Sequence, residues 1–240
     1  KPNGGPVPPR AGGLQVAGLQ TGLRRSPTRE DITLEIADRP GTAAGVYSQN
    51  HVFAAPVAYD RARTPGTGFR GVVVNSGKAN ACTGSRGEED AAAMGTTAAE
   101  AIGGLDGSVL VMSTGIIGEF LPLEKIKAGI QQAAGQLGDD EARVVRAARG
   151  LMTTDTRPKL AGGSFGRTAD GERFRLLGMA KGAAMIGPKL ATMLGILITD
   201  AALTPDAAQR LLTEATEVSF NCVSVDGHMS TNDTVLLLAN

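Results

Sequence analysis

The chain has 240 residues, 42% hydrophobic and 20% charged, which is enough to bury a sizeable core as one large domain or two small ones. Its 24 lysines and arginines balance 24 aspartates and glutamates, so nothing indicates a nucleic-acid or membrane partner, and a small-molecule ligand is expected. Only 3% of residues are aromatic, which argues against a base-stacking platform, and Cys82 and Cys222 are too few for a disulfide framework or a metal cluster.

The first third of the chain is predicted to begin as an arm and to continue as strands. Residues 1–22 are rich in Pro and Gly with little periodicity, which predicts an extended arm. Residues 32–36 and 43–47 have the composition of strands, and we expect them to pair through a turn near Pro40-Gly41. A third strand is predicted over residues 69–74. The turn Asn75-Ser76-Gly77 is expected to end this third strand.

The middle of the chain has patterns typical of helices and of one buried strand. The alanine-rich residues 88–102 carry acids in their first turn, which favours a helix. A buried strand is predicted over residues 108–112, and a further helix over 140–151. Apolar residues at helical spacing predict an amphipathic helix at Leu123, Ile126, Ile130, Ala133 and Leu137.

The last third alternates strands with one helix. Residues 162–165 and 173–177 flank an Asp170-Gly171 turn, which predicts a hairpin. Thr204-Pro205 is typical of a helix start, and this helix is expected to run to about Val218. A hydrophobic strand follows over residues 235–238. Because strands and helices alternate in mixed order, the sequence predicts a layered α/β or α+β architecture.

Thr192 is the strongest candidate for a catalytic residue. It lies where a turn at Gly187-Pro188 leads into an apolar strand. A threonine hydroxyl is a poor nucleophile, but a Thr at a new N-terminus has its own α-amine, of pKa roughly 7.7–8.0, as a base. Attack of this hydroxyl on the Ala191 carbonyl, an N-to-O acyl shift and ester hydrolysis would cut the chain there. The alternative is an ordinary Ala-Thr step at the start of a strand.

Three further features bear on the chemistry. The segment Ser113-Thr114-Gly115 leaves a predicted strand and would present a hydroxyl and an N–H as oxyanion donors, or would be a plain turn. Lys181 is a single cation among small and apolar residues, and it either meets a substrate or lies exposed on an edge strand. His51 and His228 lie in no nucleophile-elbow or protease signature, so a His-dependent triad is not favoured.

Five ordered blocks resemble the ornithine acetyltransferase family, also called the glutamate N-acetyltransferases. They extend from about Gly45 to the last residue, and together they are specific although each is weak alone. The blocks are N-S-G-K-A-N-A-C-T-G (75–84), S-T-G-I-I-G (113–118), M-T-T-D-T-R-P-K (152–159), A-K-G-A-A-M-I-G-P-K-L-A-T-M-L (180–194) and V-D-G-H-M-S-T-N-D-T (225–234).

This resemblance implies a fold and a processing event. The fold would be a layered α-β-β-α sandwich of the kind shared by DmpA and the ornithine acetyltransferases, with an N-terminal-nucleophile mechanism. Autocleavage between Ala191 and Thr192 would give an α-chain, residues 1–191, and a β-chain that starts at Thr192. The remainder of the β-chain, with further substrate-binding residues, is expected outside this sequence. His228 departs from the family, which has an acidic or small polar residue there.

The resemblance also implies the reaction and its residues. Thr192 would be the nucleophile, Thr114 and Gly115 the oxyanion hole, and Thr153 and Lys181 would bind substrate with Thr192. Thr153 is otherwise part of a polar cluster after a helix.

An acetyl group would pass from N-acetylornithine to glutamate through an acetyl-threonine in a ping-pong cycle of arginine biosynthesis. We expect no metal or cofactor, with acetyl-CoA as an alternative donor, and a cytoplasmic α2β2 assembly of its own fragments without nucleic acid or membrane. The alternatives are an aminopeptidase or amidohydrolase of the same fold, and an uncleaved binding module.

Overall fold

The chain folds as two β-layers that share one long strand. The computed structural model describes residues 12–24, 26, 28–167, 171–187 and 193–240. Within these ranges the strands form one hydrogen-bonded path, β4-β3-β2-β8-β7-β6-β5, with β1 paired to β2. The strands are β1 (Leu14–Leu19), β2 (Ile32–Tyr47), β3 (Gly66–Lys78), β4 (Val109–Ile116), β5 (Lys159–Phe165), β6 (Phe174–Lys181), β7 (Leu194–Thr199) and β8 (Thr234–Ala239).

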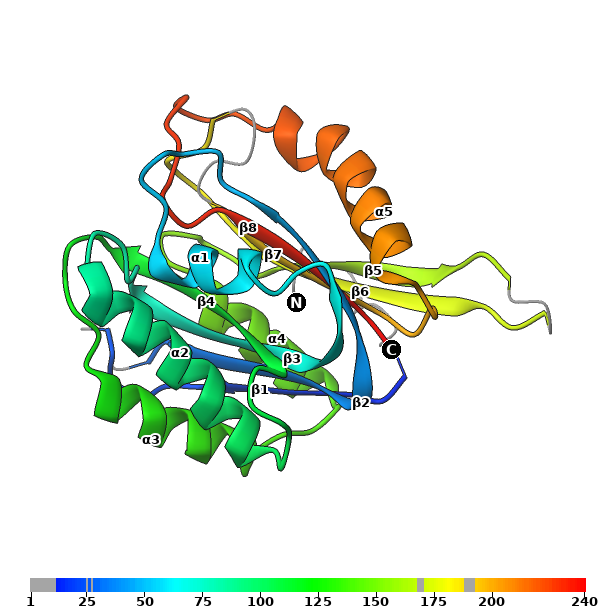
Figure 1. Ribbon diagram of the computed structural model, residues 1–240, viewed down its shortest axis with the longest axis horizontal. Helices are drawn as coiled ribbons and strands as arrows, with labels where there is room; N and C mark the ends of the chain where they lie inside the picture. Colours follow the sequence, from blue (N-terminus) through cyan, green and yellow to red (C-terminus); the bar gives the residue numbers. More distant parts are fainter. Residues whose placement is uncertain (1–11, 25, 27, 168–170, 188–192) are drawn as a thin grey trace.

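The strand β2 belongs to both layers because its pairing is interrupted near the middle. Its first half pairs with β1 and β3, and its second half, from Thr42, pairs with β8. The register to β3 shifts between Ile36 and Thr42, which is the kind of irregularity that bends a strand. Figure 1 shows β2 turning from the lower layer into the upper one. The strands β3 and β4 are parallel in the first layer, and β7 and β8 are parallel in the second.

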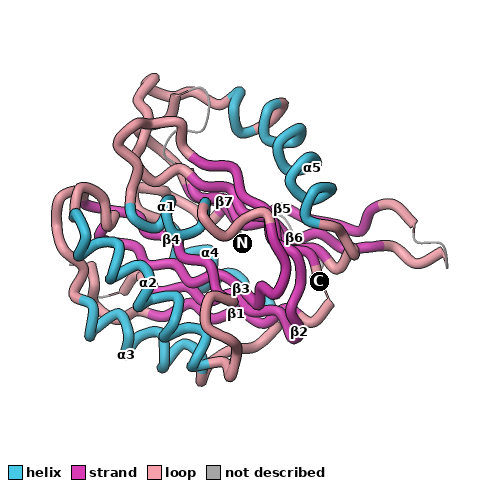
Figure 2. Tube along the Cα trace, viewed as in Figure 1, coloured by secondary structure: helices cyan, strands magenta, loops and turns pink. Residues whose placement is uncertain are grey.

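Helices cover the outer face of each layer (Figure 2), so the α-β-β-α sandwich predicted from the sequence is confirmed. Two helices pack on the first layer through a cluster that includes Met94, Ile126 and Ile130, and another packs on the second through Ala208 and Leu212. The helices are α1 (Ala55–Arg61), α2 (Gly84–Ala101), α3 (Leu123–Ala134), α4 (Glu141–Leu151), α5 (Pro205–Glu217) and the short 3-10 helix η2 (Phe220–Cys222).

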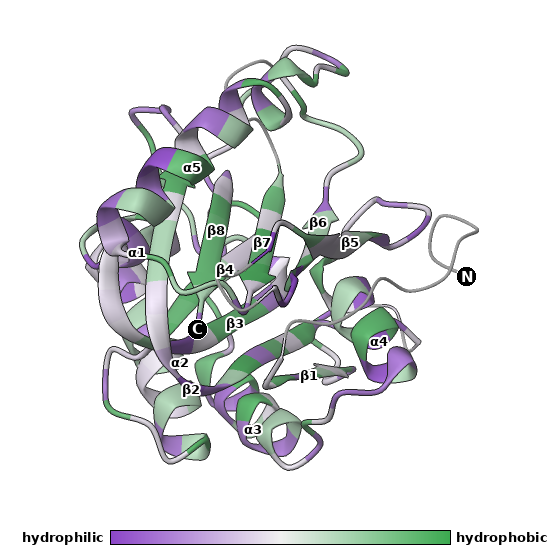
Figure 3. Cartoon of the chain, turned by 90° about the vertical axis from the view of Figure 1, so that its right-hand side faces the viewer, coloured by the Kyte–Doolittle hydropathy of each residue, from purple (hydrophilic) through white to green (hydrophobic). Residues whose placement is uncertain are grey.

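The main core lies between the two layers. In β3, Val72 and Val74 face this inner cluster, whereas Val73 faces α2 and α3, as the two-residue period of a strand requires. The helix α4 enters the same inner cluster with Val144 and Leu151. Figure 3 shows β7 and β8 as nearly continuous hydrophobic strips, because both of their faces are covered. No helix in the described ranges has the length and apolar character needed to cross a membrane.

Elements with strong local signals are confirmed. The helices predicted over 88–102, 123–137 and 140–151 correspond to α2, α3 and α4, and β5 and β6 form the predicted antiparallel hairpin. Thr204 caps α5, since its hydroxyl accepts a hydrogen bond from the Ala207 N–H at 3.3 Å. Residues 168–170 of the hairpin turn lie outside the described residues.

Two expectations for the first third are wrong. The arm predicted over residues 1–22 contains β1, whose Leu14, Val16 and Leu19 are buried against the rest of the sandwich. Residues 32–36 and 43–47 do not pair with each other, because Pro40-Gly41 lies at the irregularity inside one continuous strand instead of in a reversing turn.

The turn predicted at Asn75-Ser76-Gly77 is also wrong. These residues extend β3, because they pair in parallel with Ser113, Thr114 and Gly115 of β4. The short helix α1 was not predicted.

Candidate active site

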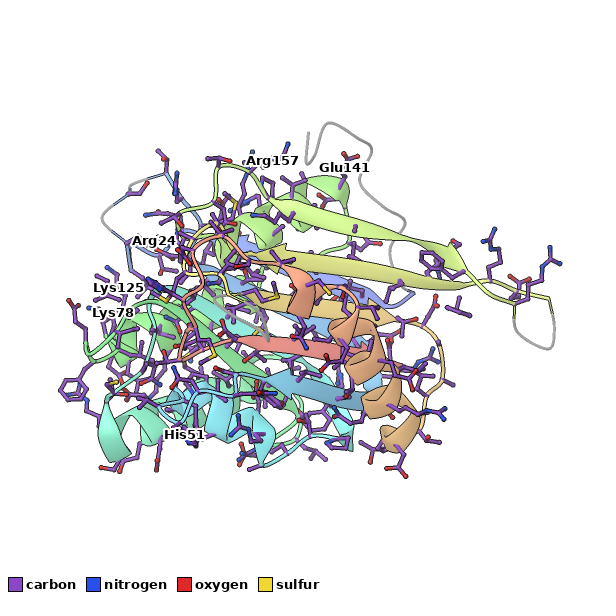
Figure 4. All side chains as sticks on the ribbon, turned by 90° about the horizontal axis from the view of Figure 1, so that it is seen from above. Arg24, His51, Lys78, Lys125, Glu141 and Arg157 are labelled. Atoms are coloured by element: carbon purple, nitrogen blue, oxygen red, sulfur yellow. The ribbon has the colours of Figure 1, made fainter. Side chains whose placement is uncertain are left out.

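A cavity of about 690 Å³ opens where β3 and β4 end. The loop before β2, the segment after α4, the segment after β6 and the loop before β8 complete its wall. Figure 4 places Arg24, one of the lining residues, at the end of the molecule opposite the last residues of β5 and the first residues of β6. The described residues that line the cavity are Arg24, Ser26, Arg29, Gly77, Ala79, Thr114, Gly115, Ile116, Ile117, Thr153, Thr154, Ala184, Met185, Ser230 and Asn232.

The predicted oxyanion residues, Thr114 and Gly115, lie in this wall at the end of β4. Gly115 has a φ of +134°, and a Cβ there would lie 2.2 Å from the carbonyl carbon of Gly77 on the neighbouring strand. Only glycine can occupy that position without moving the backbone. The close approach of the two strands therefore sets the path of the backbone beside Thr114.

Thr153 also lines the cavity, directly after α4. Its carbonyl accepts a hydrogen bond from Arg29 Nη1 at 3.0 Å, and its N–H donates to the buried Asp155 at 3.2 Å. Asp155 also accepts from the Gly182 N–H at 2.8 Å and pairs with Lys159. Burial alone would raise the pKa of Asp155, but these hydrogen bonds hold it below its usual value, so the carboxylate stays charged. The polar cluster after α4 is thus present and is joined to the end of β6.

Lys181 ends β6 and is only 3% exposed, so the alternative of an exposed edge-strand lysine is wrong. It is not among the residues that line the cavity, although Ala184 and Met185 just after it are. Burial lowers the pKa of Lys181 to about 8, while the carboxylates of Asp233 and Asp155 act to raise it.

The sequence reasoning did not single out Asp233, which is completely buried beside Lys181. Its carboxylate accepts hydrogen bonds from the N–H groups of Met193, at 2.9 Å, and Ser230, at 3.2 Å. Burial raises the pKa of Asp233 to about 7, and Lys181 acts to lower it. The sequence feature that could have pointed to Asp233 is the polar run S-T-N-D-T, residues 230–234, which directly precedes an apolar strand.

The predicted nucleophile Thr192 and its neighbour Ala191 lie outside the described residues. Met193, the residue after Thr192 in sequence, is described, is buried and directly precedes β7. Of the other candidates, neither His51 nor His228 lines the cavity. In the described part of the chain, no group of three or more His, Cys, Asp or Glu side chains is arranged to hold a metal ion.

The fold places this chain in a known structural class. It resembles an L-aminopeptidase D-Ala-esterase/amidase from Ochrobactrum anthropi, described as a variant of the Ntn hydrolase fold, with a TM-score of 0.53 over 96% of this chain and 73% of that one. At 14% identity this similarity shows the fold alone.

The sequence defines the family more closely. The ArgJ family model matches residues 15–240, and the chain belongs to that family. The arginine biosynthesis bifunctional protein ArgJ of Rhodopirellula baltica is 47% identical over 226 residues, which are 94% of this chain and 54% of that protein. An ornithine acetyltransferase from Mycobacterium tuberculosis, complexed with ornithine, has a TM-score of 0.66 at 33% identity over 75% of this chain and 94% of that one.

The resemblance drawn from the five sequence blocks is therefore confirmed. The chain spans about half the length of the curated relatives that it matches.

Proposed function

We propose that this protein is an acyltransferase that moves an acetyl group from N-acetylornithine to glutamate through an acetyl-threonine. The observation that carries this proposal is the meeting of Thr114, Gly115 and Thr153 in one cavity, in a chain that belongs to the ArgJ family. These residues come from two separate blocks of the sequence, 113–118 and 152–159. The ornithine complex of the Mycobacterium tuberculosis relative supports an amino-acid substrate.

The precursor cleaves itself between Ala191 and Thr192, which gives an α-chain of residues 1–191 and a β-chain that starts at Thr192. The freed α-amine is then the base for the adjacent hydroxyl. In the first half-reaction Thr192 attacks the acetyl carbonyl, and its hydroxyl proton passes to the amine. The tetrahedral oxyanion accepts hydrogen bonds from the Thr114 hydroxyl and the Gly115 N–H. The amine then returns the proton to the departing nitrogen, and ornithine leaves.

In the second half-reaction the α-amine of glutamate attacks the acetyl-threonine ester and gives a proton to the Thr192 α-amine. The same oxyanion donors stabilise the second tetrahedral intermediate. Its collapse breaks the ester bond, the α-amine returns the proton to the Thr192 oxygen, and N-acetylglutamate is released. Acetyl-CoA is an alternative donor for the first half-reaction, and no metal or other cofactor takes part. The working form is a cytoplasmic α2β2 assembly of the two fragments.

The charges around the cavity suit such substrates. The guanidinium groups of Arg24 and Arg29 come from one loop of its wall, and both can pair with a carboxylate. Thr153 contacts the substrate from the adjoining segment of the wall, where its carbonyl accepts a hydrogen bond from Arg29. Lys181 acts from the end of β6. A cavity with cationic groups and few aromatic rings fits small amino acids better than nucleotides.

The fold likeness to an aminopeptidase and amidase favours one second candidate, a hydrolase in which water takes the acyl group from Thr192. Incubation with glutamate and N-acetylornithine that is radiolabelled in its acetyl group distinguishes the acetyltransferase from the hydrolase. Acetyltransfer places the label on glutamate, whereas hydrolysis releases free acetate. An uncleaved binding module would show neither product and a single intact mass.

The direct test of the nucleophile is Thr192→Ala in the full-length protein. We expect this variant to remain uncleaved and to transfer no acetyl group, because both steps need the hydroxyl. Thr192→Ser is the matched control, since it keeps a hydroxyl and an α-amine and is expected to keep measurable cleavage and transfer. Acetyl transfer by the purified Ala variant would exclude Thr192 as the nucleophile.

A further inference from the structure

Two adjacent residues of the loop before β8, Asn232 and Asp233, bond to different sides of the candidate site. Both are buried, and Asn232 also lines the cavity. The two side chains have different hydrogen-bond partners, so this short segment contacts two different elements. None of the residues predicted from the sequence to take part in the reaction belongs to this loop.

Asn232 holds the ends of β3 and β4. Its side-chain Nδ2 donates hydrogen bonds to the carbonyl oxygens of Ser113, at 2.8 Å, and Ala79, at 2.6 Å. Its Oδ1 accepts from the Thr231 hydroxyl at 2.6 Å. Both hydrogens and the oxygen of this 5% exposed amide are therefore used. Because Ser113 directly precedes Thr114, Asn232 fixes the peptide that leads into the oxyanion pair.

A second contact braces the same strand ends. The Ser113 hydroxyl donates to the Asn75 side-chain oxygen, and the Asn75 amide donates to the Lys78 carbonyl at 3.0 Å. Buried networks in which every group is paired hold one geometry, because any shift leaves a polar atom unsatisfied. The residue before Thr114 is thus held through both its carbonyl and its side chain.

Asp233 holds the start of β7. Besides the hydrogen bonds from the Met193 and Ser230 N–H groups, the backbone N–H of Thr234 donates to the Met193 carbonyl at 3.2 Å. The Met193 peptide is therefore anchored at its N–H and at its carbonyl. On the other side, the Ser48 N–H donates to the Asp233 carbonyl at 2.8 Å, which ties the loop to the end of β2.

We propose that Asn232 and Asp233 are positioning residues that together set the separation between the Thr114–Gly115 donors and the chain entering β7 at Met193. This inference rests on the proposed function, in which the residue before Met193 is the nucleophile. Misplacement of reacting groups by about 1 Å can lower a rate ~100-fold, so a rigid two-residue link between donors and nucleophile is directly useful.

The test uses the full-length protein with Asn232→Ala and Asp233→Ala. We expect each change to slow precursor cleavage and to lower kcat of the processed enzyme by about 10- to 100-fold, with KM changed much less. Asp233→Asn keeps an oxygen that can accept the Met193 N–H, so it should rescue most of the rate at its own pH optimum. Thr33→Val is the matched control, because it removes a buried 2.8 Å hydrogen bond to the Ala147 carbonyl and should lower Tm without changing kcat.

A double variant makes the test specific to the oxyanion donors. If Asn232 acts through β4, then Asn232→Ala should lower kcat by a much smaller factor in a Thr114→Ala background than in the wild type. Effects of the two substitutions on kcat that simply multiply would overturn the inference. Unchanged cleavage and kcat in both Asn232→Ala and Asp233→Ala would also overturn it. So would an Asp233→Asn variant whose kcat is as low as that of Asp233→Ala. A wild-type protein that neither cleaves nor transfers acetyl groups would instead overturn the proposed function itself.

Discussion

The buried polar groups in the middle of the sandwich differ from those at its cavity end. Glu35 lies in the first half of β2, opposite Val16 and Val72 of the inner core, and is 1% exposed. Neither of its carboxylate oxygens has a hydrogen-bond partner among the described residues. At the cavity end, Asn232 and Asp233 have several partners each.

This difference in hydrogen-bond partners distinguishes a candidate functional site from an isolated buried acid. Burial raises the pKa of Glu35 to about 8, so this side chain is mostly neutral at pH 7 and has no charge for a ligand to meet. Asp233 and Lys181 are also buried, but each lies within reach of the other's opposite charge and beside the cavity. Burial with specific partners next to a cavity indicates a functional site, whereas burial alone does not.

The largest effect that we expect at the cavity end comes from Thr114→Ala. Loss of one oxyanion donor lowers kcat by about 10²–10³, because the donor stabilises charge that exists only in the transition state. Steady-state kinetics of the processed enzyme, with KM measured separately, would check this. Thr154→Ala is a control on the same cavity wall, since no role in the reaction is proposed for it. An unchanged kcat in Thr114→Ala would remove this residue from the oxyanion hole.

In the middle of the sandwich, Glu35→Gln should remove a pH-dependent loss of stability. The folded protein keeps a proton on Glu35 up to about pH 8, whereas the unfolded chain releases it near 4.5, so this contribution is lost as pH rises between these values. Relative to the Gln variant, the wild type should lose on the order of 3 kcal/mol between pH 5 and pH 8. Chemical denaturation at both pH values measures this difference, and parallel curves for the two proteins would contradict the buried, neutral Glu35.

A smaller effect is expected on the pH profile of Asp233→Asn. The charge of Asp233 raises the pKa of Lys181, as does that of Asp155, while Arg24 and Lys159 act to lower it. Removal of the Asp233 charge should therefore move the alkaline limb of kcat, where Lys181 loses its proton, to lower pH by about one unit. Asp200→Asn, which breaks an ion pair with Arg175, is the control and should leave the limb in place. An unmoved limb in Asp233→Asn would show that Lys181 does not set it.

The sequence predicted those parts of the fold that local chemistry determines. The Thr204-Pro205 start of α5 and the β5–β6 hairpin have short-range causes, and both are confirmed. The strand β1 was missed because Pro and Gly around it obscure its apolar residues, and its burial depends on pairing with β2. The course of β2 through Pro40-Gly41 likewise depends on two partners that are distant in sequence, β3 and β8.

In the candidate site, too, features with a local sequence cause were predicted, and features that depend on distant strand pairing were not. Thr114, Gly115 and Thr153 were identified from their motifs, and the structure brings them to one cavity. The partnership of Lys181 with Asp233 could not be predicted, because it follows from the register in which Lys181 pairs with Leu194 and Leu194 with Thr234. A one-residue slip in either strand pair would separate the two charges.

The most direct test of the central claim is the mass and N-terminal sequence of active full-length protein. The account predicts two fragments, one that ends at Ala191 and one that begins Thr192-Met193-Leu194, in material that transfers acetyl groups to glutamate. Active protein with a single intact mass and no new N-terminus at Thr192 would contradict it.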